Sequence, residues 1–431
     1  MRLQLDKIFI DRVQFANETR INKGLLCIDR EELQGILRED GRLGQVEIEL
    51  ACPGESCRIL QVVDVIEPRA KTGDSEGDFP GALGKQGAVG EGNTIVLSGA
   101  AVLLSEQREE AKGTKAAHGE FIDMTGDAAD ISAYGKTCNI VLLPQPAEGV
   151  GPTEYKIALK IAGLKAAVYL ARAGRDLSPD ATEVYELPPL TGVTKGLDGL
   201  PKVAYIYQVL TTQLGSIPGH PILYGIAIDG MLPTIIHPNE ALDGAIVTPY
   251  RSQAMDTYDI QNHAVIRELY RRHGQDLCFV GVIMTIAGNN QPENDRTAIM
   301  AARMAKWSLG AEGVVLTKSG GGAPEVPMAQ TARRCEELGM KVAVAMAHYA
   351  ADESDSSFDG GIIFNVPEVN AIVSMGTPWA TVTVPRVDRL IGHAAPRSED
   401  DRAIGEMRTQ VRWIRGATTQ LGSSRLIAVR Y

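Results

Sequence analysis

The sequence predicts an α/β protein with two doubly wound, mostly parallel sheet domains and a β-rich N-terminal domain. Strand-like and helix-like segments alternate in residues 138–210 and again in residues 278–376, and such alternation with short loops implies right-handed crossovers between parallel strands. Residues 1–70 instead show the period-two pattern of half-exposed strands. Glycine is abundant, with 45 residues, and aromatic residues make up only 5%, as in α/β folds with many tight strand-to-helix turns.

Three domains are expected from these patterns: a β-rich domain over 1–100, a first α/β domain over 101–255 and a second over 256–431. In the first, alternating segments predict strands in 3–15, 46–54, 57–68 and 93–107. The segment REELQGILRED, residues 30–40, predicts a short amphipathic helix, and residues 70–92, rich in Gly and Asp, predict a long loop.

The first α/β domain begins with CNIVLLPQP, residues 138–146, a continuous apolar run typical of a strand that is covered on both faces. A helix is expected to start at Pro152 and to stop at Gly174. Its apolar stripe consists of Ile157, Ile161, Leu164 and Val168.

Later segments repeat the same pattern. Further strands are predicted in 202–211, 221–228, 277–285, 312–318, 341–346, 361–365 and 371–376. Helices are predicted in 293–309 and 328–338, and each ends at a glycine, Gly310 or Gly339.

Composition limits the class of protein. The net charge of −11 and the sequence pI near 5.3 argue against electrostatic binding of nucleic acid or of an anionic membrane surface. No apolar run approaches the roughly 20 residues of a spanning helix, and the N-terminus resembles a strand rather than a secretory signal. We therefore expect a cytoplasmic protein.

The six cysteines are sparse and irregularly spaced, which is typical of free thiols in a reducing compartment. Cys52 and Cys57 have four residues between them, a loose version of zinc-ligand spacing, but no second pair accompanies them. Core filling is the better account of both, so no metal is expected.

Five stretches together resemble one family. They are residues 51–69, 121–143, 225–247, 264–274 and 310–322, and they occur in the family's order. The chain resembles the α/β proprotein of component B of the glycine/sarcosine/betaine reductase complexes over nearly its whole length. The resemblance implies a proprotein that is cut in two, with a cysteine converted to a pyruvoyl group that forms a Schiff base with the substrate's amine. A partner subunit then attacks the substrate carbon with a selenocysteine or cysteine.

The sequence departs from this family where the processed cysteine is expected, in the loop after the segment DGAIV, residues 243–247. Residues 245–263 contain no cysteine, and Ser252 is the one serine among them. Only Ser or Cys leaves the dehydroalanine that hydrolyses to pyruvoyl, so Ser252 remains an alternative precursor. We favour the interpretation that this member has lost the nucleophile and carries no pyruvoyl cofactor.

Ligands of open parallel sheets bind outside the carboxyl ends of the strands. At those ends the predicted substrate-binding residues are Thr285, Ser319, Gly320, Gly321 and Asn365. The glycines would let the backbone approach an anion; the alternative is a permissive loop without a ligand. Neither a phosphate-loop signature nor a GxGxxG after a strand is present, so a nucleotide cofactor has little support.

Three residues are candidates for catalysis. His348 follows the strand at 341–346, where it would be a general base, an orienting donor or a hydrogen-bonded structural residue. His263 and Asp256 flank the loop that replaces the pyruvoyl site; the alternative is that both are solvated loop residues.

Asp229 is a candidate for binding a cationic amine, or else the N-cap of a helix. His273, at a helix C-terminus, and His237, before Pro238, are interpreted as structural.

The sequence therefore favours an enzyme subunit that binds a small amine or amino-acid-like substrate without a pyruvoyl group. It would support cleavage of a C–N or related bond with a second subunit that resembles the thiol- or selenol-bearing component B partner, in a hetero-oligomer. Two alternatives remain: a self-sufficient hydrolase or lyase, with or without a metal, and a non-catalytic structural subunit.

Overall fold

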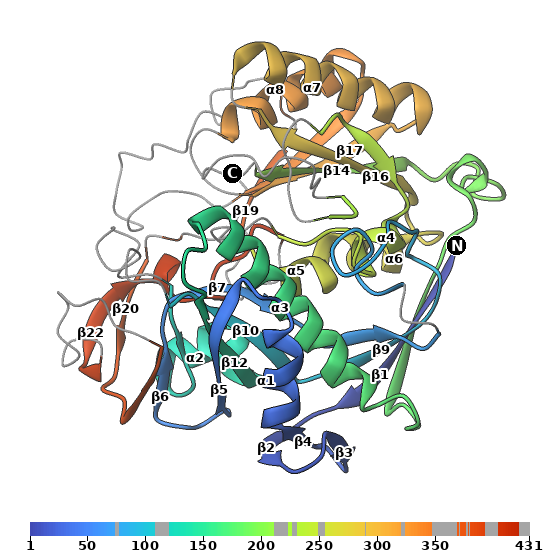
Figure 1. The fold of residues 1–431 in the computed structure, drawn as a ribbon. Helices are drawn as coiled ribbons and strands as arrows, with labels where there is room; N and C mark the ends of the chain where they lie inside the picture. The colour runs from blue at the N-terminus through green and yellow to red at the C-terminus, as the bar shows by residue number, and fades with distance from the viewer. Residues whose placement is uncertain are drawn as a thin grey trace.

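The protein is a mixed α/β structure in which the chain returns repeatedly to the same sheets (Figure 1). The computed structural model describes residues 1–73, 77–107, 120–210, 223–225, 231–248, 255–288, 290–319, 324–346, 369, 371–375, 378, 380–392 and 404–421.

The largest sheet has six strands in the order β15-β16-β14-β17-β18-β19. All of its pairs are parallel except the edge pair β15–β16. Its strands are β14 (Lys202–Leu210), β15 (Thr234–Ile236), β16 (Cys278–Ala287), β17 (Gly313–Lys318), β18 (Lys341–Met346) and β19 (Ala371–Ser374). Every residue of β16 is buried, as expected for a strand covered on both faces.

Helices lie on both sides of this sheet (Figure 1). One side carries α7 (Gln291–Arg303) and α8 (Glu325–Glu337), and α6 (Ala264–Arg272) packs against β16. The predicted helix at 293–309 is confirmed as α7 followed by a π-helical turn, Met304–Ser308. Gly310, with φ +64, ends this unit because its backbone lies in the left-handed region.

Two four-stranded sheets form the core of the N-terminal half, in the orders β13-β1-β9-β8 and β5-β12-β10-β7. Their strands are β1 (Arg2–Phe9), β5 (Leu43–Ala51), β7 (Val62–Ile66), β8 (Arg69–Lys71), β9 (Gly92–Ser98), β10 (Ala100–Ser105), β12 (Cys138–Pro146) and β13 (Ala181–Glu186). Each sheet combines one parallel pair with antiparallel ones.

The long helix α3 (Pro152–Arg172) lies across these sheets beside α1 (Arg30–Arg38) (Figure 1). Pro152 begins it, as predicted, because proline fits the first helical turn. Leu164 and Val168 of the predicted stripe are buried, while Ile157 and Ile161 are partly buried against the same core. The buried face also includes Lys160, a charged residue in an apolar setting.

Smaller sheets complete the structure. They have the orders β2-β4-β3, β11-β6-β21 and β20-β22. Their strands are β2 (Arg12–Ala16), β3 (Arg20–Asn22), β4 (Leu25–Asp29), β6 (Cys57–Ile59), β11 (Ile122–Asp123), β20 (Thr381–Val384), β21 (Arg389–Ile391) and β22 (Met407–Gln410). The pairing of β21 with β6 brings the C-terminal segment back to the N-terminal half.

The remaining helices are short: α2 (Gly126–Ile131), α4 (Pro238–Leu242) and α5 (Thr257–Gln261). The loop predicted for 70–92 begins later than expected, because Arg69–Lys71 pairs with β9. The strand predicted at 361–365 lies outside the described residues, as does most of the one at 221–228. The predicted domain boundaries remain a prediction, and hydrogen-bonded sheets cross the positions near residues 100 and 255.

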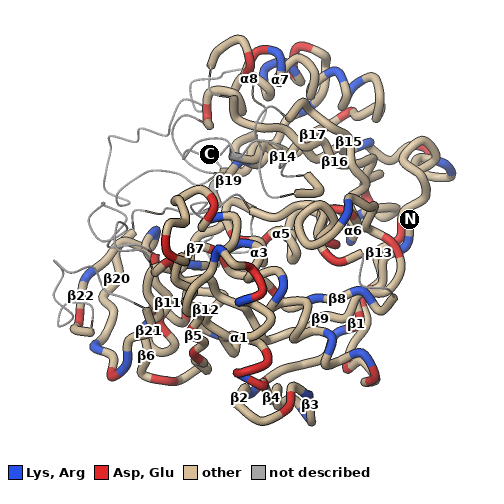
Figure 2. Tube along the Cα trace, viewed as in Figure 1, with Lys and Arg blue, Asp and Glu red and all other residues tan. Residues whose placement is uncertain are grey.

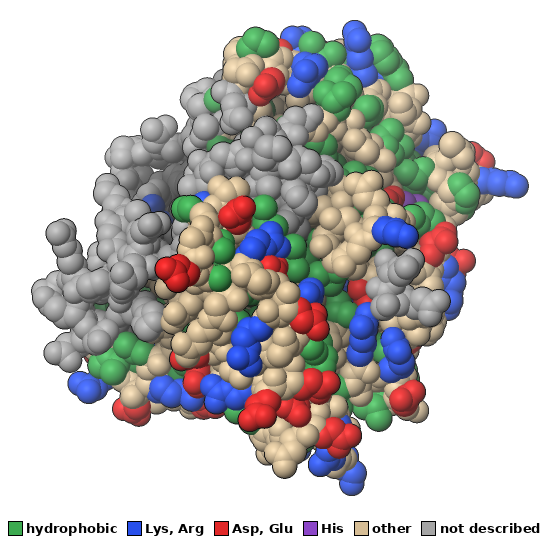
Figure 3. Space-filling view, in the orientation of Figure 1, with side chains coloured by type: hydrophobic (Ala, Val, Ile, Leu, Met, Phe, Trp, Pro, Cys, Tyr) green, Lys and Arg blue, Asp and Glu red, His purple; other side chains and the backbone are tan. Residues whose placement is uncertain are grey.

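Acidic and basic residues are scattered along the described chain (Figure 2). On the face that carries α1 and α3 they are interspersed rather than gathered by sign (Figure 3). Within the part of the chain that the structure describes, no helix is long and apolar enough to cross a membrane.

Candidate functional site

Both ends of the loop after the DGAIV segment are held at one place in the fold. The described chain stops at Thr248 and resumes at Met255, so Ser252 lies outside it. The Thr248 hydroxyl lies 3.0 Å from Nζ of Lys160 in α3. The Met255 sulfur accepts hydrogen bonds from the Tyr207 hydroxyl in β14 and from Oγ of Ser319 at 3.1 Å. The loop therefore begins against the N-terminal sheets and ends at the carboxyl edge of the six-stranded sheet.

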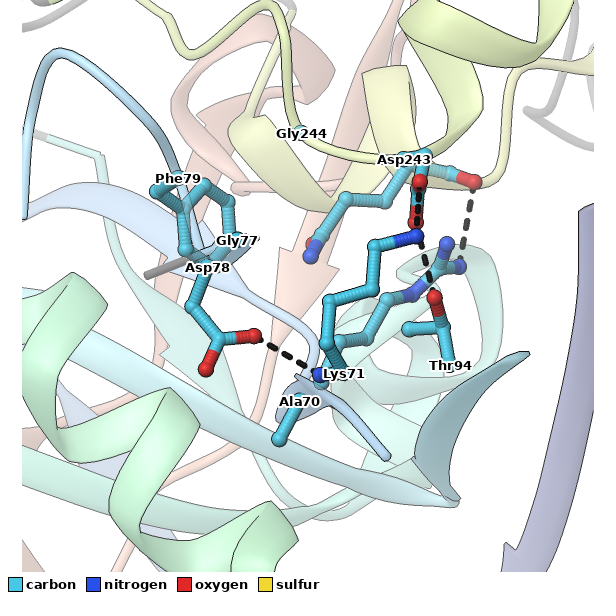
Figure 4. Close-up of a pocket in the computed structure, with 10 residues that line it drawn as sticks. Ala70, Lys71, Gly77, Asp78, Phe79, Thr94, Asp243 and Gly244 are labelled. Atoms are coloured by element: carbon cyan, nitrogen blue, oxygen red, sulfur yellow. Dashed lines mark hydrogen bonds and ion pairs between the residues drawn. The ribbon is translucent and has the colours of Figure 1, made fainter. Parts of the chain in front are cut away.

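A small pocket lies beside the start of this segment (Figure 4). The Asp243 carboxylate accepts hydrogen bonds from Nζ of Lys71, from Oγ1 of Thr94 at 2.8 Å and from the Gly90 amide at 2.7 Å. Gly244 follows with φ +96, in the left-handed region that favours glycine. Because Lys71, Thr94 and Gly90 bind the Asp243 carboxylate, they fix the start of the DGAIV segment.

A row of hydroxyl groups lines one face of the sheet at its carboxyl end. Side chains alternate along strands, so Tyr205 and Tyr207 of β14 share this face with Thr317 and Ser319 of the β17 edge. Tyr205 Oη lies 2.5 Å from Thr317 Oγ1, and Tyr207 Oη lies 3.4 Å from Ser319 Oγ. Burial raises the pKa of both tyrosines, so they act as neutral hydrogen-bonding groups.

His263 is part of this hydroxyl row. It is fully buried and caps α6, with Nδ1 accepting from the Ile266 amide at 3.5 Å. Its Nε2 lies 3.1 Å from Tyr205 Oη; because Nδ1 accepts, Nε2 carries the proton and donates. Desolvation lowers the pKa of His263 to about 3, so the ring is neutral. The alternative that His263 is a solvated loop residue is wrong, because the ring is fully buried and packs edge-on against Tyr205 and Tyr207 of β14.

Asp256 is equally buried, which rules out the same alternative for it. Its carboxylate accepts hydrogen bonds from Arg415. Nε of Arg415 lies 2.9 and 3.0 Å from the two carboxylate oxygens, and Nη2 lies 2.5 Å from one of them. Arg415 also pairs with Glu120, and burial lowers the pKa of Arg415 to about 10. Burial and the nearby charge of Asp64 raise the pKa of Asp256, while the ion pair with Arg415 acts in the opposite direction.

A second buried ion pair lies beside the first. The Asp64 carboxylate, in β7, pairs with Lys160 and accepts hydrogen bonds from the Thr257 amide at 2.9 Å and the Thr257 hydroxyl at 2.8 Å. Asp64 and Lys160 are 1% and 3% exposed at their side chains. The Asp64–Lys160 and Asp256–Arg415 pairs connect β7, α3, the start of α5 and the C-terminal segment, next to the two ends of the loop.

The predicted substrate-binding residues do not all meet. Thr285 is the register partner of Gln208, which is the register partner of Lys318. These three residues share the face that α7 and α8 cover, whereas Ser319 lies on the opposite face with Tyr207. The structure therefore separates Thr285 from Ser319. The other predicted site residues lie outside the described part of the chain: Asp229, Gly320, Gly321, His348 and Asn365.

Sequence reasoning assigned no role to several charged residues of this region, although it placed Lys318 at the end of a strand. Lys318 is fully buried, its Nζ is 3.6 Å from Glu325, and burial lowers its pKa to about 8. Lys160 carried a usable signal, because it falls beside Ile157 and Leu164 on the apolar stripe of α3, where a lysine requires a buried partner. Arg415 carried none, because nothing in its local sequence points to Asp256.

The fold and this region define a mixed α/β protein with a buried polar site at the carboxyl edge of a mostly parallel sheet. A family model described as glycine/sarcosine/betaine reductase component B subunits matches residues 1–421. The chain belongs to this family, which confirms the resemblance found in the sequence.

Related proteins align with this chain over nearly its whole length. The chain is 35% identical to the glycine reductase complex component B subunits alpha and beta of Acetoanaerobium sticklandii, over 100% of both chains. It is 35% identical to the sarcosine reductase complex component B subunit alpha of Peptoclostridium acidaminophilum, over 91% of this chain and 89% of that protein. The betaine reductase complex component B subunit alpha of the same organism is 31% identical, over 94% and 91%. No solved structure matches the chain.

Proposed function

We propose that this chain is the substrate-binding subunit of a reductase complex that acts on a small amine or amino-acid-like compound without a pyruvoyl group. Its relatives are component B subunits of the glycine, sarcosine and betaine reductase complexes. The observation that carries the proposal is the placement of the loop after DGAIV, whose two ends are fixed to the hydroxyl row and to the buried ion pairs.

We infer that this chain carries no pyruvoyl group, with Ser252 as the one serine in the loop that could still supply it. The hydroxyls flanking the loop belong to Thr248 and Thr257, which contact each other at 3.2 Å. A threonine would leave a larger oxo group than pyruvoyl, and no cysteine occurs between Ala245 and His263. Without a protein carbonyl the substrate amine cannot be held as an imine, so its binding is non-covalent.

The chemistry we propose follows from that loss. A cationic amine is bound by carboxylate and hydroxyl groups, and the substrate carbon is presented to a thiol or selenol of a second subunit. The sulfur or selenium forms a bond to this carbon as the C–N bond breaks, and the amine leaves with the bonding electron pair. Asp256, Tyr207 and Ser319 lie beside the second end of the loop, because both hydroxyls bond the Met255 sulfur and Asp256 is the next residue.

Intact mass and borohydride trapping test the proposal. The purified chain is expected to run as one polypeptide, and borohydride with a primary amine is expected to add no mass to it. A reduced adduct on a fragment that begins near residue 252 would show that Ser252 had been converted, and would refute the proposal.

Assays with and without the partner separate the other functions. Cleavage of a C–N bond is expected only when the thiol- or selenol-bearing subunit is present. Turnover by the chain alone, lost on treatment with a chelator, would instead support a metal-assisted hydrolase or lyase. A complex whose activity is unchanged by Asp256→Asn, Tyr207→Phe and Ser319→Ala together would indicate a structural subunit.

A further inference from the structure

Two cysteines from distant parts of the sequence meet across a pair of antiparallel strands. In the ladder between β5 and β12, Ala51 is the register partner of Asn139. One step further along both strands, Cys52 lies opposite Cys138. Directly opposite residues point to the same face of a sheet, and both cysteines pack against the same hydrophobic core.

The backbone places this pair where side chains approach most closely. The Cys138 amide donates to the Gly99 carbonyl on the β10 side, and the Cys52 amide donates to Oε1 of Glu55 at 3.0 Å. Neither amide therefore bonds across the β5–β12 ladder, so the two cysteines form a non-hydrogen-bonded pair. The Cα atoms of such pairs are about 4.5 Å apart, within the range of roughly 4.4–6.8 Å that a disulfide bridges.

The two thiols also differ in reactivity. Cys52 is partly exposed and lies opposite Cys138, one step beyond the Ala51–Asn139 pair. The thiol–thiol hydrogen bond is the main reason that the pKa of Cys52 falls to about 7, against its ordinary value of 9.0. Cys138 is 1% exposed, and the same hydrogen bond raises its pKa. A thiolate open to attack is thus paired with a buried thiol.

We infer that Cys52 and Cys138 form a redox-active dithiol that reduces small-molecule disulfides. The Cys52 thiolate attacks one sulfur of the disulfide R–S–S–R, forms a mixed disulfide and releases one thiolate, RS⁻. The Cys138 thiol loses its proton and attacks the Cys52 sulfur, which expels the second RS⁻ and leaves an internal disulfide. One proton comes from Cys138 and the other is the proton that Cys52 released to solvent when it ionised, so one dithiol and one disulfide yield one internal disulfide and two thiols.

The order of these steps follows from the structure. Cys52 reacts first because it is partly exposed and has the lower pKa of the two, whereas Cys138 is buried. Once its sulfur is in the mixed disulfide, the main cause of the raised pKa of Cys138, its hydrogen bond to a Cys52 thiolate, no longer exists. Cys138 then lies directly opposite the sulfur that it must attack.

The probe for this inference is 4,4′-dithiodipyridine, an aromatic disulfide, added in slight excess to the reduced full-length chain near pH 7. The wild type should release about two equivalents of thiopyridone in its fast phase and retain no adduct, with a mass about 2 Da lower that dithiothreitol restores. Cys138→Ala should release about one equivalent and keep the mixed disulfide on Cys52. Cys52→Ala should lose the fast phase.

Cys57→Ala is the matched control, because Cys57 is buried, lies nearby in β6 and has a pKa raised by burial. It should react as the wild type does. If Cys138→Ala is not folded by circular dichroism, the wild type decides the matter alone through peptide mapping of the Cys52–Cys138 bond. A stable mixed disulfide on wild-type Cys52, or a bond from Cys52 to another cysteine, would overturn the inference.

The pH dependence of alkylation gives an independent measurement. In the wild type the rate at Cys52 should reach half of its maximum near pH 7 and level off about one pH unit higher, where most of the thiol is ionised. In Cys138→Ala the donor is lost, so the midpoint should move upward toward the ordinary thiol value. An unchanged midpoint would show that Cys138 does not activate Cys52.

Discussion

Replacement of Lys160 by methionine tests how the site beneath the loop is stabilised. Lys160 comes from the middle of α3, its side chain is 3% exposed, and it pairs with Asp64, whose side chain is 1% exposed. Methionine has a similar length and no charge, so the variant leaves a buried carboxylate whose remaining partners are the amide and hydroxyl of Thr257. Removing one member of a buried ion pair costs about 3–5 kcal/mol, and we expect Lys160→Met to lower the free energy of unfolding by that amount.

The same helix provides a matched control. Lys165 pairs with Glu39 at 3.7 Å, with side chains 31% and 69% exposed, and such surface pairs contribute about 0–1 kcal/mol. Urea unfolding followed by circular dichroism should therefore show a large loss for Lys160→Met and a small one for Lys165→Met. Adding Asp64→Asn to Lys160→Met should recover part of the loss, because the buried charge is removed. Equal stability of the two single variants would refute the reasoning.

Three other predictions concern His263, Arg415 and His348. Because the pKa of His263 is about 3 in the folded state, acid favours the unfolded chain. The free energy of unfolding should fall by up to about 1.4 kcal/mol for each pH unit between 6.5 and about 3. This slope should be smaller in His263→Asn, and parallel plots of stability against pH for the two proteins would contradict the assignment. Arg415→Met should cost about 3–5 kcal/mol, since it leaves Asp256 and Glu120 buried without their cation, whereas Arg408→Met, at an exposed position, should change the unfolding midpoint little. His348→Ala is expected to lower activity at least about tenfold while circular dichroism remains unchanged, and near-wild-type turnover would remove His348 from the mechanism.

Periodicity predicted those parts of the fold whose stability comes from local pattern and burial. The helix from Pro152 and the strands predicted at 138–146 and 312–318 follow from apolar spacing and from proline and glycine signals. The structure confirms them, with the second strand at Gly313–Lys318. The three-residue strand β8 was missed because Arg69–Lys71 has no alternating pattern of its own. Only its pairing with β9 makes it a strand.

The candidate site was only partly predictable. His263 and Asp256 were singled out because they flank the altered loop, but the sequence did not show that both are buried helix caps. Thr285 and Ser319 were expected in one site, and strand register places them on opposite faces. Which residues of neighbouring strands share a face of the sheet can be predicted from a sequence only when the register between those strands is known.

The sequence alone determined the family, the alternation of strands and helices, and the absence of a cysteine after DGAIV, because each of these depends on residue order. The tertiary structure decided which charges are neutralised and which thiols meet. Asp64 pairs with Lys160, Asp256 with Arg415, and Cys52 lies opposite Cys138, although each pair is far apart in the chain. Such contacts form only when distant segments pack into the same sheets. The pKa and the pairing of a buried charge or thiol then depend on the residues that this packing brings next to it.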